Sequence, residues 1–112
     1  MNNHPRVFVS GPYTKPDPVV NTRAAIDAAD KLFELGCFPY VPHLSMFWHM
    51  VHARPWEDWL RLDQHWLRQC DCVLRLPGES PGAGKECLHA AANNIPVFDS
   101  IEAIQNAMQA AE

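Results

Sequence analysis

Residues 72–92 read CVLRLPGESPGAGKECLHAAA, so a short apolar strand, a turn-rich loop and an alanine-rich helix follow one another. A loop of this kind at the carboxyl end of a parallel strand is where open α/β sheets bind their ligands. Its backbone N–H groups and the dipole of the following helix favour an anion. We therefore expect a ligand site at this loop.

Glu86 ends the glycine-rich loop and is expected in the first turn of a helix over residues 83–94. The field at the helix N-terminus stabilises a carboxylate, so this side chain should stay ionised at neutral pH. A fixed, ionised carboxylate beside an anion-binding loop has the properties of a nucleophile for a sugar carbon. Acidic residues are also common in first helical turns as simple caps, and this alternative stays open.

Strand and helix patterns alternate along the rest of the chain. Short apolar runs predict strands at residues 6–10, 37–41, 71–76 and 95–98. Helical patterns cover residues 19–35, 55–69, 83–94 and 100–110, and residues 42–54 are expected to be irregular or partly helical. The alternation predicts a single α/β domain over residues 1–112. It should be a flavodoxin-like (Rossmann-like) three-layer fold with a small parallel sheet of four to five strands.

The order of the strands decides where the loops meet. We expect the order 2-1-3-4, which places the loops after the first and third strands side by side at the switch point of the sheet. Residues 11–14 should therefore face residues 80–86. Gly11 and Tyr13 become candidate ligand contacts, and a packed loop aromatic is the equal alternative for Tyr13.

The composition is that of an ordinary globular protein, with 47% hydrophobic and 20% charged residues. The net charge of −4 argues against a role in coating nucleic acid or binding a membrane surface. No apolar run approaches the roughly 20 residues of a membrane span. The polar N-terminus shows no secretory signal, so we expect a cytoplasmic protein whose four cysteines are reduced thiols.

Asp63 is the second carboxylate of interest. It lies in the helix predicted over residues 55–69, in the middle of an apolar stripe. The stripe consists of Trp56, Trp59, Leu60, Trp66 and Leu67. A carboxyl among tryptophans needs a partner or a function, because desolvation would raise its pKa and suit it to general acid–base chemistry. An aspartate that caps a loop or pairs with an arginine is the alternative.

Ser80, Gly82 and Gly84 form an S-x-G-x-G loop. Such a loop can bind a phosphate through the serine hydroxyl and through backbone N–H groups that glycine leaves accessible. A turn that needs glycine only for its geometry is the alternative. The loop matches neither a P-loop nor a dinucleotide-binding fingerprint.

Histidines and aromatic residues gather between residues 42 and 54. The segment could form a wall on which a base stacks, and His43 is its candidate contact, whereas Phe47 and Trp48 are expected in the core. The spacing of His43, His49 and His52 matches no common zinc motif, so we expect no metal site.

Two runs resemble the core of the nucleoside 2-deoxyribosyltransferase superfamily. Residues 63–73 read DQHWLRQCDCV and residues 80–86 read SPGAGKE. They are similar to the superfamily pattern D-x-x-W-L-x-x-A-D-x-V followed by S-x-G-x-G-x-E, especially as the 2′-deoxynucleoside 5′-phosphate N-hydrolases carry it. Residues 7–12, VFVSGP, also resemble the first strand and loop of those enzymes. The resemblance follows the order of elements over the whole chain.

The resemblance implies catalytic roles for two residues. Glu86 matches the nucleophile that attacks the anomeric carbon, and Asp63 matches the aspartate that handles the proton on the base or orients the sugar. Asp71 matches an acid at the start of the third strand and should be structural. The tyrosine that the superfamily often carries on its first strand is absent, because Val7 and Phe8 stand there.

The resemblance also implies a binding site and a partner. Ser80, Gly82 and Gly84 match the loop that holds the 5′ end of the substrate, and Ser80 indicates a phosphate rather than a free hydroxyl. Ser10 and Gly11 match contacts from the first loop. The relatives are dimers or larger, so a homo-oligomer is expected, and the protein carboxyls imply no metal or organic cofactor.

These observations together predict an N-glycosidase that hydrolyses a (deoxy)nucleoside 5′-monophosphate through Glu86. The same site would be a nucleoside 2-deoxyribosyltransferase if a second base, rather than water, resolved the glycosyl-enzyme. A non-catalytic nucleotide-sensing module is the alternative from another class. A structural domain without any ligand is the third possibility.

Overall fold

The computed structural model describes residues 1–110, in which strands and helices alternate as the sequence predicts. The elements are β1 (Arg6–Ser10), α1 (Pro18–Glu34), β2 (Phe38–Tyr40), the 3-10 turn η1 (Pro42–Leu44), α2 (Ser45–Val51), α3 (Trp56–Leu67), β3 (Cys72–Arg75), α4 (Pro81–Ala92), β4 (Val97–Phe98) and α5 (Ile101–Ala110). Among the described residues, no helix has both the length and the apolar character that crossing a membrane requires.

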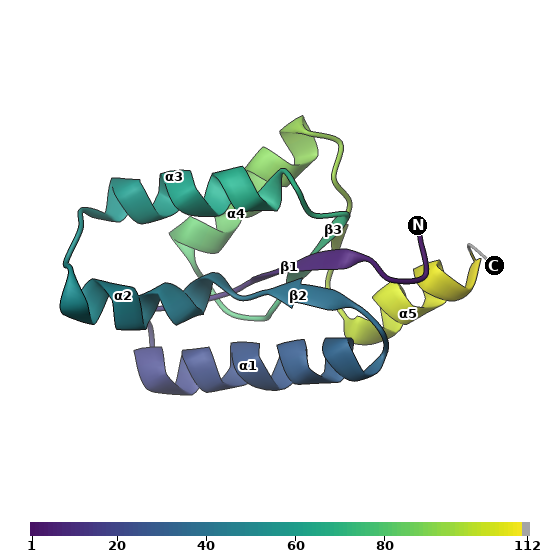
Figure 1. Ribbon diagram of the computed structural model, residues 1–112, viewed down its shortest axis with the longest axis horizontal. Coiled ribbons are helices and arrows are strands. Elements are labelled where there is room, and N and C mark those ends of the chain that lie inside the picture. Colours follow the sequence, from purple (N-terminus) through teal and green to yellow (C-terminus); the bar gives the residue numbers. More distant parts are fainter. Residues whose placement is uncertain (111–112) are drawn as a thin grey trace.

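The four strands form one all-parallel sheet in the order β2-β1-β3-β4, which confirms the predicted order. Helices α1 and α5 lie on one face of this sheet and α3 and α4 on the other, so the fold is the expected three-layer α/β arrangement (Figure 1). Strand β2 lies on one side of β1 and β3 lies on the other side. The crevice at this switch point opens at the carboxyl ends of β1 and β3.

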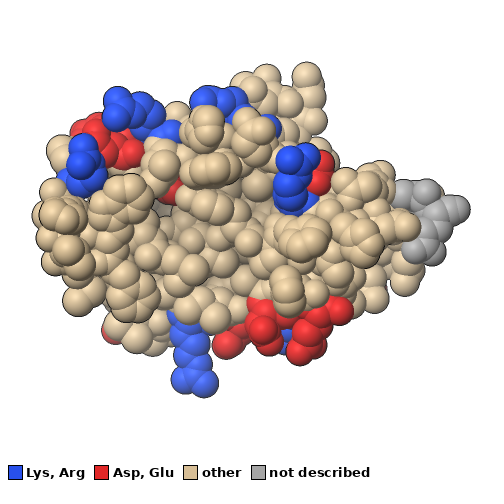
Figure 2. All heavy atoms as spheres, in the orientation of Figure 1, with Lys and Arg blue, Asp and Glu red and all other residues tan. Residues whose placement is uncertain are grey.

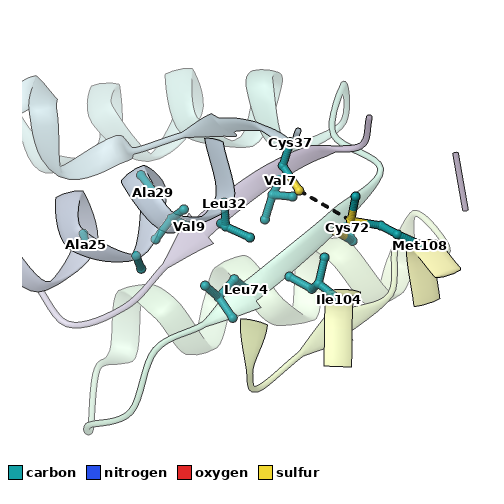
Figure 3. Close-up of a cluster of buried hydrophobic side chains, with 11 residues drawn as sticks. Val7, Val9, Ala25, Ala29, Leu32, Cys37, Cys72, Leu74, Ile104 and Met108 are labelled. Carbon is teal, nitrogen blue, oxygen red and sulfur yellow. Dashed lines mark hydrogen bonds between the residues drawn. The ribbon is translucent and has the colours of Figure 1, made fainter. Parts of the chain in front are cut away.

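The larger part of the core lies between the sheet and helices α1 and α5. Val7 and Val9 of β1 contact buried residues of both helices there, among them Leu32 and Ile104 (Figure 3). Phe8 points to the opposite face and packs against α3 and α4. The alternation of β1 therefore sends Ser10, two residues after Phe8, to the α3–α4 side.

The cysteines contribute to this core as thiols. All four are free, and Cys37 and Cys72 are buried. The Cys37 Sγ lies 3.7 Å from the Met108 Sδ, between the start of β2 and the last helix (Figure 3). Burial raises the pKa of the Cys37 and Cys72 thiols and keeps them protonated, so these two cysteines serve as packing groups.

Helix ends follow local signals in the sequence. The Asp17 carboxylate caps α1 by accepting from the N–H groups of its first turn, and Gly36 ends that helix with a φ of 93°. Ser100 caps α5 through the N–H of Ala103, as predicted. Helix α4 begins at Pro81, two residues before the predicted start, because Ser80 is the N-cap and proline suits the first helical position.

Candidate active site

A cavity of about 460 Å³ opens at the carboxyl ends of β1 and β3. Four segments line it: the β1–α1 loop, the stretch from η1 through α2 to the loop before α3, helix α3 and the start of α4. The first and last of these include Gly11, Tyr13, Ser80 and Glu86, so the loops that were expected to face each other do so. The cavity lies at the switch point of the sheet, where ligands of open α/β folds bind.

Glu86 lies in the second turn of α4, with only 8% of its surface exposed. The hydroxyl of Ser10 donates a hydrogen bond of 2.7 Å to its Oε1. Burial raises the pKa of Glu86 to about 7, whereas the Ser10 hydrogen bond and the positive charge of Arg75 lower it. The prediction that Glu86 lies in the first helical turn is wrong, because α4 begins at Pro81, and desolvation opposes the helix field that was expected to keep this carboxylate ionised.

Asp63 is also buried, on the side of α3 that faces the cavity. Burial raises the pKa of its carboxyl to about 7, and the hydroxyl of Tyr40 opposes part of that rise. The Asp63 Oδ1 has no hydrogen-bond partner within residues 1–110. No arginine pairs with Asp63 in this part of the chain, so the alternative of an Arg-paired aspartate finds no support.

The two carboxyls act on one another electrostatically. The negative charge of Asp63 raises the pKa of Glu86, so the pair holds one proton near neutral pH. The Ser10 hydroxyl and Arg75 stabilise the carboxylate form of Glu86, and the Tyr40 hydroxyl stabilises that of Asp63. Titration of the pair can leave one carboxylate and one carboxylic acid facing the same cavity.

The N-terminus of α4 forms another wall of the cavity. The Ser80 Oγ accepts the N–H of Ala83 at 3.1 Å, and the Ser80 carbonyl accepts the N–H of Gly84 at 2.9 Å. Proline has no N–H, so the Gly82 N–H is the first-turn donor left for a ligand. Gly82 lines the cavity, and a Cβ placed on it would meet only the Ser80 Oγ, at 3.9 Å.

Gly84 differs from Gly82 although both belong to the predicted glycine loop. Both residues lie within α4, which corrects the prediction for Gly82 and agrees with the predicted helix over residues 83–94 for Gly84. Gly84 is exposed and lies outside the cavity lining, and a Cβ on it would meet nothing within 4 Å. Of the two glycines, only Gly82 is placed to contact a ligand.

The loop after β1 supplies the opposite wall. A Cβ on Gly11 would lie 2.9 Å from the Leu76 Cβ, so the loop needs glycine where it passes the end of β3. Tyr13 lines the cavity with 39% of its surface exposed. Asn21 of α1 holds this loop by donating to the carbonyls of Tyr13 and Lys15, both at 2.9 Å.

His43 belongs to the cavity wall but is buried rather than displayed as a stacking surface. Its Nε2 lies 2.9 Å from the carbonyl of Pro12, to which it donates, and its ring lies 6.0 Å from that of Tyr13. Burial lowers the pKa of His43, so the imidazole is neutral at physiological pH. Ser10 likewise lies behind the cavity wall, fully buried against Glu86.

The aromatic segment folds differently from the sequence prediction. Phe47 and Trp48 are 61% and 51% exposed, so the prediction that they lie in the core is wrong. The helix that carries them, α2, buries none of its residues against the sheet. Within residues 1–110, no three His, Cys, Asp or Glu side chains converge as a possible set of metal ligands.

Two residues of the site were missed by sequence reasoning. Tyr40, at the end of β2, brings a hydroxyl to Asp63, and the negative charge of Glu86 also acts on it. Arg54, which precedes α3, also lines the cavity, and its guanidinium is paired with the Asp58 carboxylate at 3.0 Å. The expected strand order places the end of β2 beside β1, which was the available signal for Tyr40. Nothing in the local pattern marked Arg54.

Asp71 lies at the other end of the sheet. Its Oδ2 accepts the backbone N–H of Arg6 at 2.7 Å, and the Arg6 guanidinium lies 3.5 Å from its Oδ1. It joins the beginnings of β1 and β3, in agreement with a structural role.

Fold and site together define an α/β protein with a cavity at the switch point of a flavodoxin-like sheet. Residues 5–99 match the model of a family described as a domain of unknown function, DUF4406, and the chain belongs to that family. The matched region contains both Asp63 and Glu86. No protein with a curated description matches the chain.

Proposed function

We propose that the protein is an N-glycosidase that hydrolyses a (deoxy)nucleoside 5′-monophosphate. The observation that carries this proposal is the pair of buried carboxyls in one cavity. Ser10 fixes Glu86 and stabilises its carboxylate form, and burial raises the pKa of both carboxyls to about 7, so we assign the nucleophile's role to Glu86 and the acid's role to Asp63. Cleavage of a glycosidic bond needs one carboxylate and one carboxylic acid at the reacting centre.

In the first step, the ionised Glu86 attacks C1′ of the sugar while the bond from C1′ to the base nitrogen breaks. The electron pair of that bond leaves with the base, and Asp63 donates its proton to the base. The transition state has oxocarbenium character, and the product is a glycosyl ester of Glu86. In the second step, the Asp63 carboxylate takes a proton from water, which attacks C1′ and releases Glu86.

The walls of the cavity suit the two ends of such a substrate. The Gly82 N–H and the Ser80 hydroxyl lie at the N-terminus of α4, where an anion is favoured, and we assign the 5′-phosphate to this wall. Trp56 and Trp59 of α3 line the cavity together with Met46 of α2 and provide apolar surface for a base.

The resemblance to the nucleoside 2-deoxyribosyltransferase superfamily supports the same assignment. Glu86 and Asp63 are the residues that match its nucleophile and its proton-handling aspartate. We propose that Tyr40 of β2, whose hydroxyl acts on Asp63, takes the place of the tyrosine that the superfamily often carries on its first strand.

The test is release of free base, measured by chromatography. The panel contains deoxyribo- and ribonucleoside 5′-monophosphates and the matching nucleosides, and Glu86→Ala is the control variant. Base released from a monophosphate and lost in the variant would support the hydrolase. Release that requires an added acceptor base would identify a transferase. Binding of nucleotides without any release would contradict the proposal and favour the sensing module.

A further inference from the structure

His49 joins helices α2 and α3 at the wall of the cavity. Its Nδ1 accepts the indole N–H of Trp59 at 3.0 Å and the backbone N–H of Arg54 at 3.2 Å. Both partners are donors, so this nitrogen carries no proton and the imidazole proton lies on Nε2. His49, Arg54 and Trp59 all line the cavity. His49 therefore ties a short helix that buries none of its residues to a cavity residue of α3.

The Trp59 ring has free space on more than one side. It lines the main cavity and also a second cavity of about 260 Å³. The second cavity is formed by Trp48, Arg54, Asp58, Trp59, Arg61 and Leu62. Close packing holds a core ring in one rotamer, whereas a ring that borders two cavities has room to turn. The hydrogen bond to His49 therefore fixes the orientation of the Trp59 ring.

Two rings of α2 support the same orientation. The His49 ring lies 5.8 Å from the Trp59 ring at 71°, and the Trp48 ring lies 5.1 Å from it at 81°. Perpendicular contacts at such centroid distances are favourable. Residues 41–53 contain no Lys, Arg, Asp or Glu, and the surface over α2, at the left of Figure 2, shows no blue or red atoms. No charged side chain of this segment therefore competes for the His49 acceptor.

We propose that His49 is a positioning residue for the base of the substrate, and that it acts by holding the Trp59 ring as a stacking surface. This inference rests on the proposed function, because it assigns a role to one wall of the same site. A planar base gains free energy by stacking on an aromatic ring. The gain is larger when the ring is already oriented, because binding then does not have to restrict its rotation.

The hydrogen bond to His49 also determines what Trp59 offers to a ligand. The indole N–H is the only polar group of that side chain, and His49 accepts it. Trp59 therefore presents its ring atoms to the cavity, beside the apolar side chain of Met46. The ligand group that fits this wall is a planar heteroaromatic ring held by stacking. A sugar or a phosphate would gain little from it.

The experiment is calorimetric titration of full-chain variants in the Glu86→Gln background, where turnover does not interfere. The probes are the common 2′-deoxynucleoside 5′-monophosphates and deoxyribose 5-phosphate, which lacks a base. His49→Gln removes the acceptor at the Nδ1 position, whereas His49→Asn places an amide oxygen there. His52→Gln is the matched control, because His52 is exposed and lies outside the cavity lining.

His49→Gln should weaken binding of the nucleotides by about fivefold or more, and His49→Asn should restore most of the affinity. Deoxyribose 5-phosphate should bind every variant equally, and His52→Gln should bind the nucleotides as the parent does. Equal losses in His49→Asn and His49→Gln would indicate direct contact through Nε2 and overturn the positioning role. Unchanged affinity in His49→Gln, or a loss shared by deoxyribose 5-phosphate, would also overturn it.

Trp59→Phe isolates the hydrogen bond itself. Phenylalanine keeps an aromatic ring without the N–H, so this variant should weaken nucleotide binding as His49→Gln does. The double variant should bind no more weakly than either single variant, because one interaction is lost in all three. Additive losses would mean that His49 acts independently of Trp59 and would overturn the proposal.

Base release by the wild-type chain tests the proposed function separately. Release, together with unchanged nucleotide binding in His49→Gln, would leave the hydrolase in place and overturn only the role of His49. Binding that changes in the expected way, without any base release from wild type, would overturn the hydrolase and support the role of His49.

Discussion

The hydroxyl of Ser10 donates a hydrogen bond of 2.7 Å to the Oε1 of Glu86, joining the end of β1 to the second turn of α4. Both side chains are buried, so water does not compete for this contact. The hydrogen bond stabilises the charged form of Glu86 against the desolvation that raises its pKa. Ser10 thus sets the protonation state and the position of the proposed nucleophile without touching the substrate.

Replacing Ser10 with alanine should raise the pKa of Glu86 above its value of about 7, because the stabilising donor is lost. Glu86 must be ionised to attack, so the acid limb of the pH–rate profile should move to higher pH. We expect a loss of about tenfold or more at pH 6 and a smaller loss at pH 8. Ser45→Ala is the control, since Ser45 lines the same cavity. A uniform loss at all pH values would contradict this role of Ser10.

Asp63→Asn should stabilise the protein at alkaline pH. The pKa of Asp63 is raised to about 7, above the value of about 3.9 in an unfolded chain. Its favourable contribution is therefore complete below pH ~4 and is lost as the pH rises through ~7. Asparagine has the same shape and no charge, so it avoids that loss.

The expected gain of Asp63→Asn is on the order of 2 kcal/mol at pH 8 and shrinks toward pH 5. Thermal unfolding at the two pH values measures it. Asp27→Asn, at an exposed ion pair on α1, should change the melting temperature little at either pH. A variant that is less stable than wild type at pH 8 would show that the Asp63 carboxylate is well solvated or paired.

Tyr40→Phe should raise the pKa of Asp63 further, because the hydroxyl opposes the effect of burial on that carboxyl. Asp63 acts as the acid, so the alkaline limb of the pH–rate profile should move to higher pH. Phenylalanine keeps the ring stacked on Phe8, whose centroid lies 5.5 Å away, so the fold should survive. An unchanged alkaline limb would assign Tyr40 to packing alone.

The residue patterns were sufficient to predict the architecture and to select Asp63 and Glu86, both of which line the cavity. Alternation along β1 separates Val7 and Val9 from Phe8 and Ser10, and the strand order then brings Ser10 to the side of Glu86. The alternation along β1 is a local periodicity of the sequence, and the strand order was inferred from the succession of strands and helices along the chain.

The protonation state of Glu86 could not be predicted from these sequence patterns. The helix field on Glu86 is a local effect, whereas its desolvation depends on the packing of several elements around it. The helix start at Pro81 was missed because Gly82 has low helix propensity, although Ser80 and Pro81 form a regular start signal. Phe47 and Trp48 were assigned to the core by residue type, although the sheet offers α2 no face to cover.

The two glycines of α4 provide a matched pair for testing the proposed phosphate wall. Alanine in place of either glycine should stabilise the helix by about 0.5–1 kcal/mol. Neither Cβ would meet a close protein atom, so both variants should fold. Only Gly82 lines the cavity, where a Cβ would occupy space beside the first-turn N–H that we assign to the phosphate.

Gly82→Ala should therefore weaken binding of a nucleoside 5′-monophosphate by about tenfold or more, while Gly84→Ala leaves it unchanged. Calorimetric titration into a Glu86→Gln background measures binding without turnover, and thermal unfolding measures the stabilisation. The matching nucleoside, which lacks the phosphate, should be less sensitive to Gly82→Ala than the monophosphate is. Equal losses for nucleoside and nucleotide would place the sugar or base, rather than the phosphate, against this turn of α4.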